Sequence, residues 1–300
     1  MDVLGSDRNF LGMQDHCIWN EAEVAVLPVP LEATTSYITG TVDGPDALLK
    51  ASHQVEFYDD ELRIETCRRG IATIPPVDFS GCDQKRALDL VADRTGQILN
   101  AGKKPLLIGG EHSLSIGAVR ALTALYSDLH VLHLDAHADL RNSYQNSPVN
   151  HACVMARIRE ICRFSSIGIR SLSSEEAETV RKGSLNIWDI HRIRRTPDWI
   201  GQVLGSFEGP VYLTLDLDVF DPAVIPNVGT PEPGGFWWQE ALVFLKRIFQ
   251  SHPVVGLDVV ELCPSAGPNY GVFNAAKLVY RLIGYWLESE EKQESRNKKQ

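Results

Sequence analysis

The sequence predicts one α/β domain built on a mainly parallel β-sheet. Short apolar segments alternate with segments of helical periodicity along most of the 300-residue chain. Several of these short segments, such as residues 24–29 and 211–217, are almost continuously apolar, which is typical of parallel strands covered by helices on both faces. A hydrophobic content of 44% is sufficient for such a core, and no repeat or linker divides the chain.

We expect this single domain to occupy residues 21–287. Residues 1–20 are polar with scattered acids and are predicted to form an N-terminal extension. Residues 288–300 are charged and lack apolar side chains, so we expect a disordered tail there.

The expected strands and helices follow from the periodicity. Apolar runs predict strands at residues 24–29, 70–77, 105–108, 129–134, 164–169, 185–188, 211–217 and 254–260. Helical spacing predicts helices at residues 85–100, 113–126, 174–182, 198–207, 237–249 and 268–287, and Pro45 suits the first position of another helix. Residues 30–45 form a long loop rich in Thr, Ser, Gly and Pro, a kind of segment that is often functional.

Composition excludes several classes of protein. A net charge of −10 and a pI near 5.4 argue against a general nucleic-acid binder and suit a small cationic substrate, although a surplus of surface glutamates is the commoner explanation of acidity. No apolar run reaches the length of a membrane span, and the N-terminus lacks the pattern of a secretory signal. The six cysteines form no Cys-x-x-Cys pair, so we expect free thiols and a cytoplasmic location.

Four of the predicted strands end in polar residues that are able to bind a metal. These endings are residues 109–113 (GGEHS), 135–139 (DAHAD), 214–221 (TLDLDVFD) and 258–261 (DVVE). The carboxyl ends of parallel strands meet at one edge of a sheet, so we expect the four endings to lie side by side. In an extended backbone, Asp135, His137 and Asp139 would also point to the same face.

The number of acids gathered at this edge indicates two metal ions. Burying unpartnered carboxylates costs several kcal/mol each, so a cluster of four aspartates requires a strong positive charge. One divalent ion is not sufficient, whereas two are. With two histidines, the predicted ligand set is His112, Asp135, His137, Asp139, Asp216 and Asp218. Such oxygen-rich ligation favours Mn²⁺, although other divalent transition ions fit as well.

Some polar residues near these motifs have a simpler structural explanation. His112 could cap the helix that follows, although Ser113 is better suited to that position. The last aspartates do not match a calcium loop, because the required Gly and Glu are missing, and Asp221 precedes a proline as a turn former does. His130 and His133 lie inside a predicted strand, where we expect hydrogen-bonded core histidines, with contact to the ligands as the alternative for His133.

Taken together, the motifs resemble those of the ureohydrolases, the family of arginase and agmatinase. The resemblance extends from about Val24 to Tyr285 and is strongest to bacterial agmatinases. It implies the arginase-type fold, a three-layer αβα sandwich. The segments that resemble agmatinases are residues 28–30 (PVP), 34–37 (TTSY), 40–45 (GTVDGP), 168–171 (GIRS) and 229–235 (GTPEPGG).

The resemblance implies two Mn²⁺ ions per subunit, with Asp135 and Asp216 as bridging ligands. One ion would be held by His112, Asp135, Asp139 and Asp216, and the other by His137, Asp135, Asp216 and Asp218.

The resemblance also implies roles for three residues in catalysis. Glu261 matches the position that binds the substrate guanidinium, and His151 matches a mobile-loop histidine that shuttles protons. Asp139 would pass on the proton of the water. The implied reaction is hydrolysis of agmatine to putrescine and urea by a metal-bridging hydroxide.

Several alternatives to agmatinase remain open at this stage. Within the family they are guanidinobutyrase, guanidinase and arginase. On the same fold, a deacetylase would use a single Zn²⁺ and lack the first histidine motif, which His112 argues against. A non-catalytic or regulatory subunit would be expected to lose ligands, yet all six are present. The resemblance further implies a homotrimer or homohexamer.

The sequence departs from the agmatinase pattern at two places where the far end of a substrate is expected to bind. Asn150 stands where a serine is usual, and the bulky run Phe236-Trp237-Trp238 follows the Pro-Gly-Gly segment. The usual Val-Met-Arg-Arg is also replaced, by Val-Met-Ala-Arg at residues 154–157. These departures concern the choice of substrate and leave the metal ligands untouched.

Overall fold

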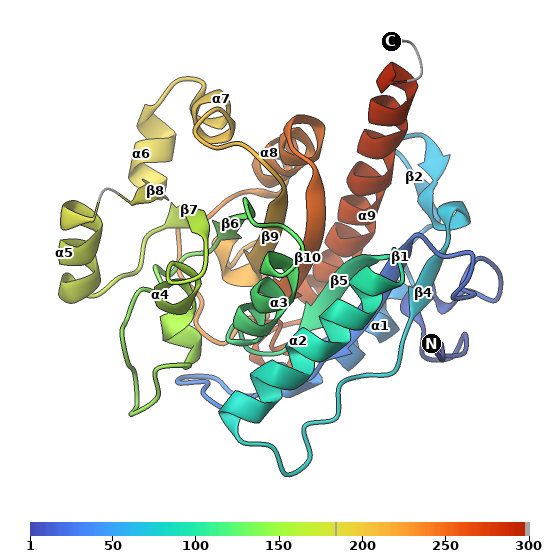
Figure 1. The fold of residues 1–300 in the computed structure, drawn as a ribbon, viewed down its shortest axis with the longest axis horizontal. Coiled ribbons are helices and arrows are strands. Elements are labelled where there is room, and N and C mark those ends of the chain that lie inside the picture. Colours follow the sequence, from blue (N-terminus) through green and yellow to red (C-terminus); the bar gives the residue numbers. More distant parts are fainter. Residues whose placement is uncertain (184, 298–300) are drawn as a thin grey trace.

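The chain folds into three layers, with a parallel sheet between two layers of helices (Figure 1). The structure is a computed structural model that describes residues 1–183 and 185–297. Eight strands form the sheet in the order β4-β1-β5-β10-β9-β6-β7-β8, and every pairing in it is parallel. The predicted three-layer α/β fold is therefore confirmed.

The eight strands of the sheet follow the predicted apolar runs to within a few residues. Their bounds are β1 Val24–Val29, β4 Ile71–Thr73, β5 Lys104–Gly109, β6 His130–Leu134, β7 Arg163–Ile169, β8 Asn186–Asp189, β9 Val211–Asp216 and β10 Val254–Val260. A separate two-stranded antiparallel sheet pairs β2 (Tyr58–Asp59) with β3 (Ile64–Glu65).

The helices agree with the predicted periodicity, except for two short helices that were not predicted, α4 and α6. The α-helices are α1 Gly44–Ser52, α2 Gln84–Asn100, α3 Leu114–Thr123, α4 Val154–Ile158, α5 Ser174–Lys182, α6 Ile190–Arg195, α7 Trp199–Leu204, α8 Trp238–Ser251 and α9 Asn269–Asn297. Short 3₁₀ turns lie at Phe10–Gly12, Thr41–Asp43, Thr66–Arg69, His151–Cys153, Leu217–Val219 and Pro264–Ala266. None of the helices in the described part of the chain is long and apolar enough to cross a membrane.

Each face of the sheet is covered by its own set of helices. Helices α1 and α6–α9 share one hydrophobic core, and α2, α3 and α4 share the other. Strand β1 shows the division, because Val24 and Val26 belong to the first core and Ala25 and Leu27 to the second. Burial on both faces explains why the strands read as continuous apolar runs.

The N-terminal extension packs on the domain, and the predicted disordered tail is helical as far as residue 297. In residues 1–20, Phe10 and Leu11 are buried in the core, and the Leu4 amide donates to the Thr73 carbonyl at 2.8 Å. At the other end, α9 continues past residue 288 to Asn297 (Figure 1), while residues 298–300 lie outside the described part. Once α9 is anchored on the core, Glu, Lys, Gln and Arg extend it at little cost, because propagation is easier than nucleation.

The four strands with polar endings are the four central strands of the sheet. Strands β5, β10, β9 and β6 are consecutive neighbours, as the edge argument required. Val260 pairs with Asp216, and Leu134 pairs with Leu215, so the polar residues that follow lie in one row. This row forms the floor of the candidate site.

Candidate active site

The site is centred on the side chain of His112, which follows β5. Its Nδ1 lies 3.1 Å from Asp135 Oδ2, 3.4 Å from Asp139 Oδ2 and 3.3 Å from Asp216 Oδ2. Despite these three oxygens, this buried Nδ1 has no partner with hydrogen-bond geometry. An imidazole nitrogen surrounded by carboxylates in this way fits the coordination of a divalent cation.

His137 forms a second, adjoining group with two aspartates. Its Nδ1 is 2.8 Å from Asp218 Oδ2 and 3.5 Å from Asp135 Oδ1. Among the described residues, ligand atoms close enough to hold one ion fall into two groups, His112 with His133, Asp135 and Asp139, and Asp135 with His137 and Asp218. Asp135 belongs to both groups, which is the arrangement expected of a bridging ligand. Asp216 is outside both groups, although it touches His112.

The two aspartate-rich loops hold each other in place through backbone amides. The Ala136 amide donates to Asp218 Oδ1 at 2.9 Å, and the Asp218 amide donates to Asp216 Oδ1 at 2.9 Å. Asp139 and Glu261 have φ angles of 51° and 65°. Such left-handed conformations are unfavourable for these residues and are found mainly where function requires them.

The charges of the site perturb the pKa values of its members in opposite directions. Burial lowers the pKa of His112 and His137, but the neighbouring aspartates outweigh it and raise both well above 6.5. Burial and the charge of nearby aspartates raise the pKa of Asp139 and Asp216 well above 3.8. Burial raises the pKa of Asp135, but His133 and His112 outweigh burial and hold this pKa well below 3.8. Crowded carboxylates of this kind are what bound cations would neutralise.

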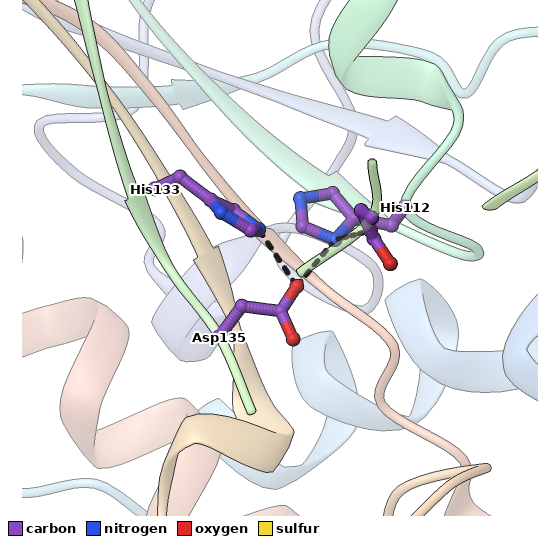
Figure 2. Close-up of side chains that lie close together, drawn as sticks. His112, His133 and Asp135 are labelled. Carbon is purple, nitrogen blue, oxygen red and sulfur yellow. Dashed lines mark hydrogen bonds and ion pairs between the residues drawn. The ribbon is translucent and has the colours of Figure 1, made fainter. Parts of the chain in front are cut away.

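His133 is a hydrogen-bonded core histidine, as predicted, and it also contacts a candidate ligand. Its Nε2 lies 2.8 Å from Asp135 Oδ2, and its Nδ1 lies 2.9 Å from Ser166 Oγ. Figure 2 shows the rings of His112 and His133 converging on the same oxygen of Asp135. His133 therefore helps to orient Asp135, the alternative that the sequence left open.

A buried carboxylate behind the site orients the ring of His112. Asp258 accepts hydrogen bonds from Tyr212 Oη at 2.5 Å, Ser115 Oγ at 2.6 Å and Thr214 Oγ1 at 2.7 Å. Because the Thr214 hydrogen points to Asp258, its oxygen accepts from Nε2 of His112 at 2.8 Å. Nδ1 is then the ring nitrogen that faces the aspartates and that would bind a metal once its proton is lost. This network was not predicted, although a lone acid inside the apolar run of β10 was a signal of a partnered buried charge.

A pocket of about 130 Å³ opens over these residues. This volume is several times what one water molecule requires by the same kind of measure, about 10–15 Å³, so it has room for a small polar head group. Its lining is formed by Ser36, His112, His137, Ala138, Asp139, Arg141, Tyr144, His151, Ala152, Ser171, Leu172, Glu176, Asp216, Thr230 and Glu261.

Glu261 and His151 reach this pocket from two different segments. Glu261 follows β10 and accepts the amide hydrogen of His112 at 2.6 Å. Burial and the charge of Asp216 raise the pKa of Glu261 well above 4.5. His151 begins a short 3₁₀ turn, where its ring lies 3.1 Å from Thr34 Oγ1 through Nδ1 and 3.3 Å from Ser36 Oγ through Nε2. The structure thus brings together all the predicted site residues.

The residues at the two departures from the agmatinase pattern do not line this pocket. Asn150 is buried, and its Oδ1 accepts the Ala152 amide as a helix cap. Phe236 is fully buried and stacks on Trp199 with ring centroids 5.8 Å apart, whereas Trp237 is exposed at the surface. None of these residues lines the pocket. Arg141, Tyr144 and Leu172 line it instead, where Asn150 and the aromatic run had been expected.

Ser113 and Asp221 were predicted to be a helix cap and a turn former. Ser113 precedes α3 but makes no capping bond, because its hydroxyl donates to Glu111 instead. Asp221 is the expected turn former, since it accepts the amides of Ala223 at 3.0 Å and Gly234 at 2.8 Å.

Comparison with known proteins identifies the family. A model of the arginase family matches residues 22–284. The chain belongs to the arginase family. This confirms the resemblance found in the motifs.

Several relatives are similar over almost their full length. The chain is 40% identical to the N(1)-aminopropylagmatine ureohydrolase of Synechocystis sp., over 95% of this chain and 96% of that protein. It is 35% identical to the agmatinase of Bacillus anthracis, over 84% and 87%. The crystal structure of the agmatine ureohydrolase of Thermoplasma volcanium superposes with a TM-score of 0.85 at 29% identity, covering 95% and 96% of the two chains. These relatives identify the chain as a hydrolase of the ureohydrolase type.

Proposed function

We propose that this protein hydrolyses the guanidinium group of agmatine, or of an agmatine bearing an aminopropyl group, to an amine and urea with two Mn²⁺ ions. The observation that carries this proposal is the unpartnered Nδ1 of His112, which faces three aspartates beneath a pocket that also contains Glu261.

The donor set suits two divalent cations. His112, Asp135, Asp139 and Asp216 would hold one ion, and His137 and Asp218 would hold the other together with the shared aspartates. When bound, the ions would offset the negative charge of the aspartates and lower the pKa of a bound water, giving hydroxide near neutral pH. The buried carboxylates, which lack enough positive charge of their own, support this assignment.

Glu261 is the group placed to bind the guanidinium. Its Oε1 already accepts the amide of His112, so the carboxylate is held in one orientation and keeps lone pairs for the substrate. A planar guanidinium pairs with a carboxylate through two parallel hydrogen bonds, which would orient its carbon over the aspartates. Asp139 and His151, which line the same pocket, would move protons from the water to the leaving amine.

The pocket lining favours a substrate whose far end is an amine. Glu176 is the acid of the lining that is assigned neither to the ions nor to the guanidinium, and the basic side chain of Arg141 is already engaged by the Tyr144 ring, 4.8 Å away, and by Glu176 Oε2 at 3.8 Å. The names of two relatives support two such substrates, agmatine and N(1)-aminopropylagmatine. Guanidino acids remain the competing class, because the Arg141 guanidinium could pair with a carboxylate.

A panel of substrates tests the proposal. Urea release is measured for the Mn²⁺-loaded protein with agmatine, N(1)-aminopropylagmatine, arginine, 4-guanidinobutyrate and guanidine. We expect the highest kcat/KM with one of the two amines. A preference for 4-guanidinobutyrate or arginine would reject the amine assignment, and no urea from any compound would reject the function itself.

Two matched substitutions test the site. Asp135→Ala should abolish both Mn²⁺ binding and urea release, because Asp135 belongs to both groups of ligands. Asp221→Asn serves as the control, since Asp221 lies in the same motif but only forms a turn. Full turnover by Asp135→Ala would disprove the assignment of the site.

A further inference from the structure

Glu111 follows β5, beside His112, and forms hydrogen bonds with the loop that precedes α1. Its carboxylate accepts the amides of Ala33 at 2.6 Å and Thr34 at 2.5 Å, together with the hydroxyls of Thr34 at 2.8 Å and Ser113 at 2.5 Å. Only 1% of Glu111 is exposed to solvent. The two amides donate to Oε2 and the two hydroxyls donate to Oε1, so both oxygens of the Glu111 carboxylate act as acceptors.

The position of one hydrogen atom follows from this arrangement. The Thr34 hydroxyl has a single hydrogen, and it is donated to Glu111 Oε1. The Thr34 oxygen must therefore accept from both of its other neighbours. One is the backbone amide of His151 at 2.9 Å, and the other is Nδ1 of the His151 ring at 3.1 Å. Nδ1 can donate to Thr34 only if it carries a hydrogen.

The opposite nitrogen of the ring is then left with the lone pair. Nε2 of His151 lies 3.3 Å from Ser36 Oγ, and both residues line the pocket over the aspartates. The edge of the Tyr144 ring packs against the imidazole, with centroids 6.3 Å apart. The ring is thus held by Thr34 through Nδ1, while Nε2, which accepts from the Ser36 hydroxyl, lies at the pocket.

We propose that Glu111 and Thr34 are positioning residues that fix the tautomer of His151 and make its Nε2 the atom that exchanges protons in the reaction. This inference rests on the proposed function, in which His151 moves a proton. Nε2 would take one proton released by the attacking water, forming an imidazolium, and return it to the nitrogen of the leaving amine. Nδ1 keeps its own hydrogen throughout, so the ring ends each turnover as it began.

The pKa of His151 agrees with a ring that is neutral before it accepts a proton. Burial lowers the pKa of His151, and the charge of Glu111 opposes this only in part. A neutral imidazole has one lone pair, and Thr34 decides which nitrogen bears it. A wrongly oriented tautomer cannot accept a proton from the pocket, and in hydrolases with a comparable buried acid and histidine its cost reaches several orders of magnitude.

The experiment compares two neighbouring threonines of the same loop. Thr34→Val removes the hydroxyl that faces His151, whereas Thr35→Val removes a hydroxyl that contacts Glu32 Oε1 at 3.3 Å. We expect Thr34→Val to lower kcat about 100-fold, since general acid–base catalysis contributes roughly 10²–10⁴-fold. Its KM and its Mn²⁺ content should stay within about twofold of wild type. Thr35→Val should leave kcat within about twofold, and Thr34→Ser should recover most of the rate.

A second readout separates positioning from a general structural role. Imidazole in the buffer should restore part of the rate of His151→Ala and of Thr34→Val, because a free base can replace a misdirected one. Circular dichroism and the urea midpoint check that each variant is folded, and Thr34→Ala replaces Thr34→Val if that variant is not. A wild-type kcat in the folded Thr34 variant, or equal losses in Thr34→Val and Thr35→Val, would overturn the inference.

The same series distinguishes this inference from the proposed function. If His151→Ala kept full activity, the proton-moving role of His151 would be wrong, and the inference would fall with it. If His151→Ala were impaired while Thr34→Val were not, only the inference would be wrong. If wild type released no urea from any guanidino compound, the proposed function would be rejected first.

Discussion

Loading the metal-free protein with Mn²⁺ should release about two protons per subunit at pH 7. The aspartates raise the pKa of His112 and His137 well above 6.5 in the absence of a metal, so both rings are imidazolium ions at neutral pH. A ring nitrogen must lose its proton before it can bind a metal. Two histidines therefore account for about two protons, and any protonated fraction of Asp139 or Asp216 would add to this number.

The release is measured by titrating chelator-treated protein with Mn²⁺ in a calorimeter, in buffers of different ionisation enthalpy. His137→Gln provides the internal test, because it removes one imidazolium and should lower the count by about one. Tight binding without proton release would refute the assignment of both histidines as ligands. An unchanged count in His137→Gln would refute the assignment of that residue alone.

The same pKa shifts predict how the stability of the metal-free protein depends on pH. A histidine whose folded pKa is raised stabilises the fold below its unfolded pKa, near 6.5, and this stabilisation is lost as pH rises through the folded pKa. The loss is about 1.4 kcal/mol per histidine for each pH unit by which its folded pKa exceeds its unfolded pKa. Urea unfolding in chelator should show a falling free energy of unfolding from pH 6 to 8, whereas Mn²⁺ should reverse the trend. A flat profile in chelator would contradict this account.

Two further substitutions test the supports of the site and of the fold. Thr214→Val removes the hydroxyl that orients His112 and should weaken Mn²⁺ binding about 10- to 100-fold. Tyr212→Phe, which removes a different hydroxyl from the same Asp258 carboxylate, should leave binding nearly unchanged. Equal affinities in the two variants would contradict the orientation argument. Arg281→Met should lower the free energy of unfolding in urea by about 3–5 kcal/mol, because it leaves the buried Asp59 without its cation. The Asp59 carboxylate lies 2.8 Å from the Arg281 guanidinium. The exposed pair of Arg68 is the control, and its loss should cost about 0–1 kcal/mol.

The strands and the polar residues at their ends could be predicted because local sequence determines both. Each central strand is an apolar run that stops at a polar residue, and burial on both faces leaves little room for another pattern. The order of the strands could not be obtained this way. Strand β10 is near the end of the sequence, yet it pairs with β5 and β9, and nothing local to residues 254–260 specifies these neighbours.

The convergence of Asp135, His137 and Asp139 was predicted, but the physical reason given for it was incomplete. Alternation in an extended strand placed Asp135, His137 and Asp139 on one face, but β6 ends at Leu134. Asp139 instead reaches His112 from a left-handed conformation, with φ of 51°. The residues meet because the loop is tied to the neighbouring strands, as by the Ala136 amide on Asp218. Tertiary hydrogen bonds of this kind leave no periodic trace in the sequence.

The positions that escaped prediction share one physical property, which is that each acts through another residue. Glu111 reaches His151 through Thr34, across 117 positions of sequence between the threonine and the histidine. Asp258 reaches His112 through Thr214 in the same way. In both cases a buried carboxylate takes the single hydrogen of a threonine hydroxyl, so the threonine can only accept from the imidazole. A carboxylate bonded directly to the ring would add its full charge to a site already rich in acids, whereas the intervening hydroxyl fixes the tautomer and keeps that charge one residue farther away.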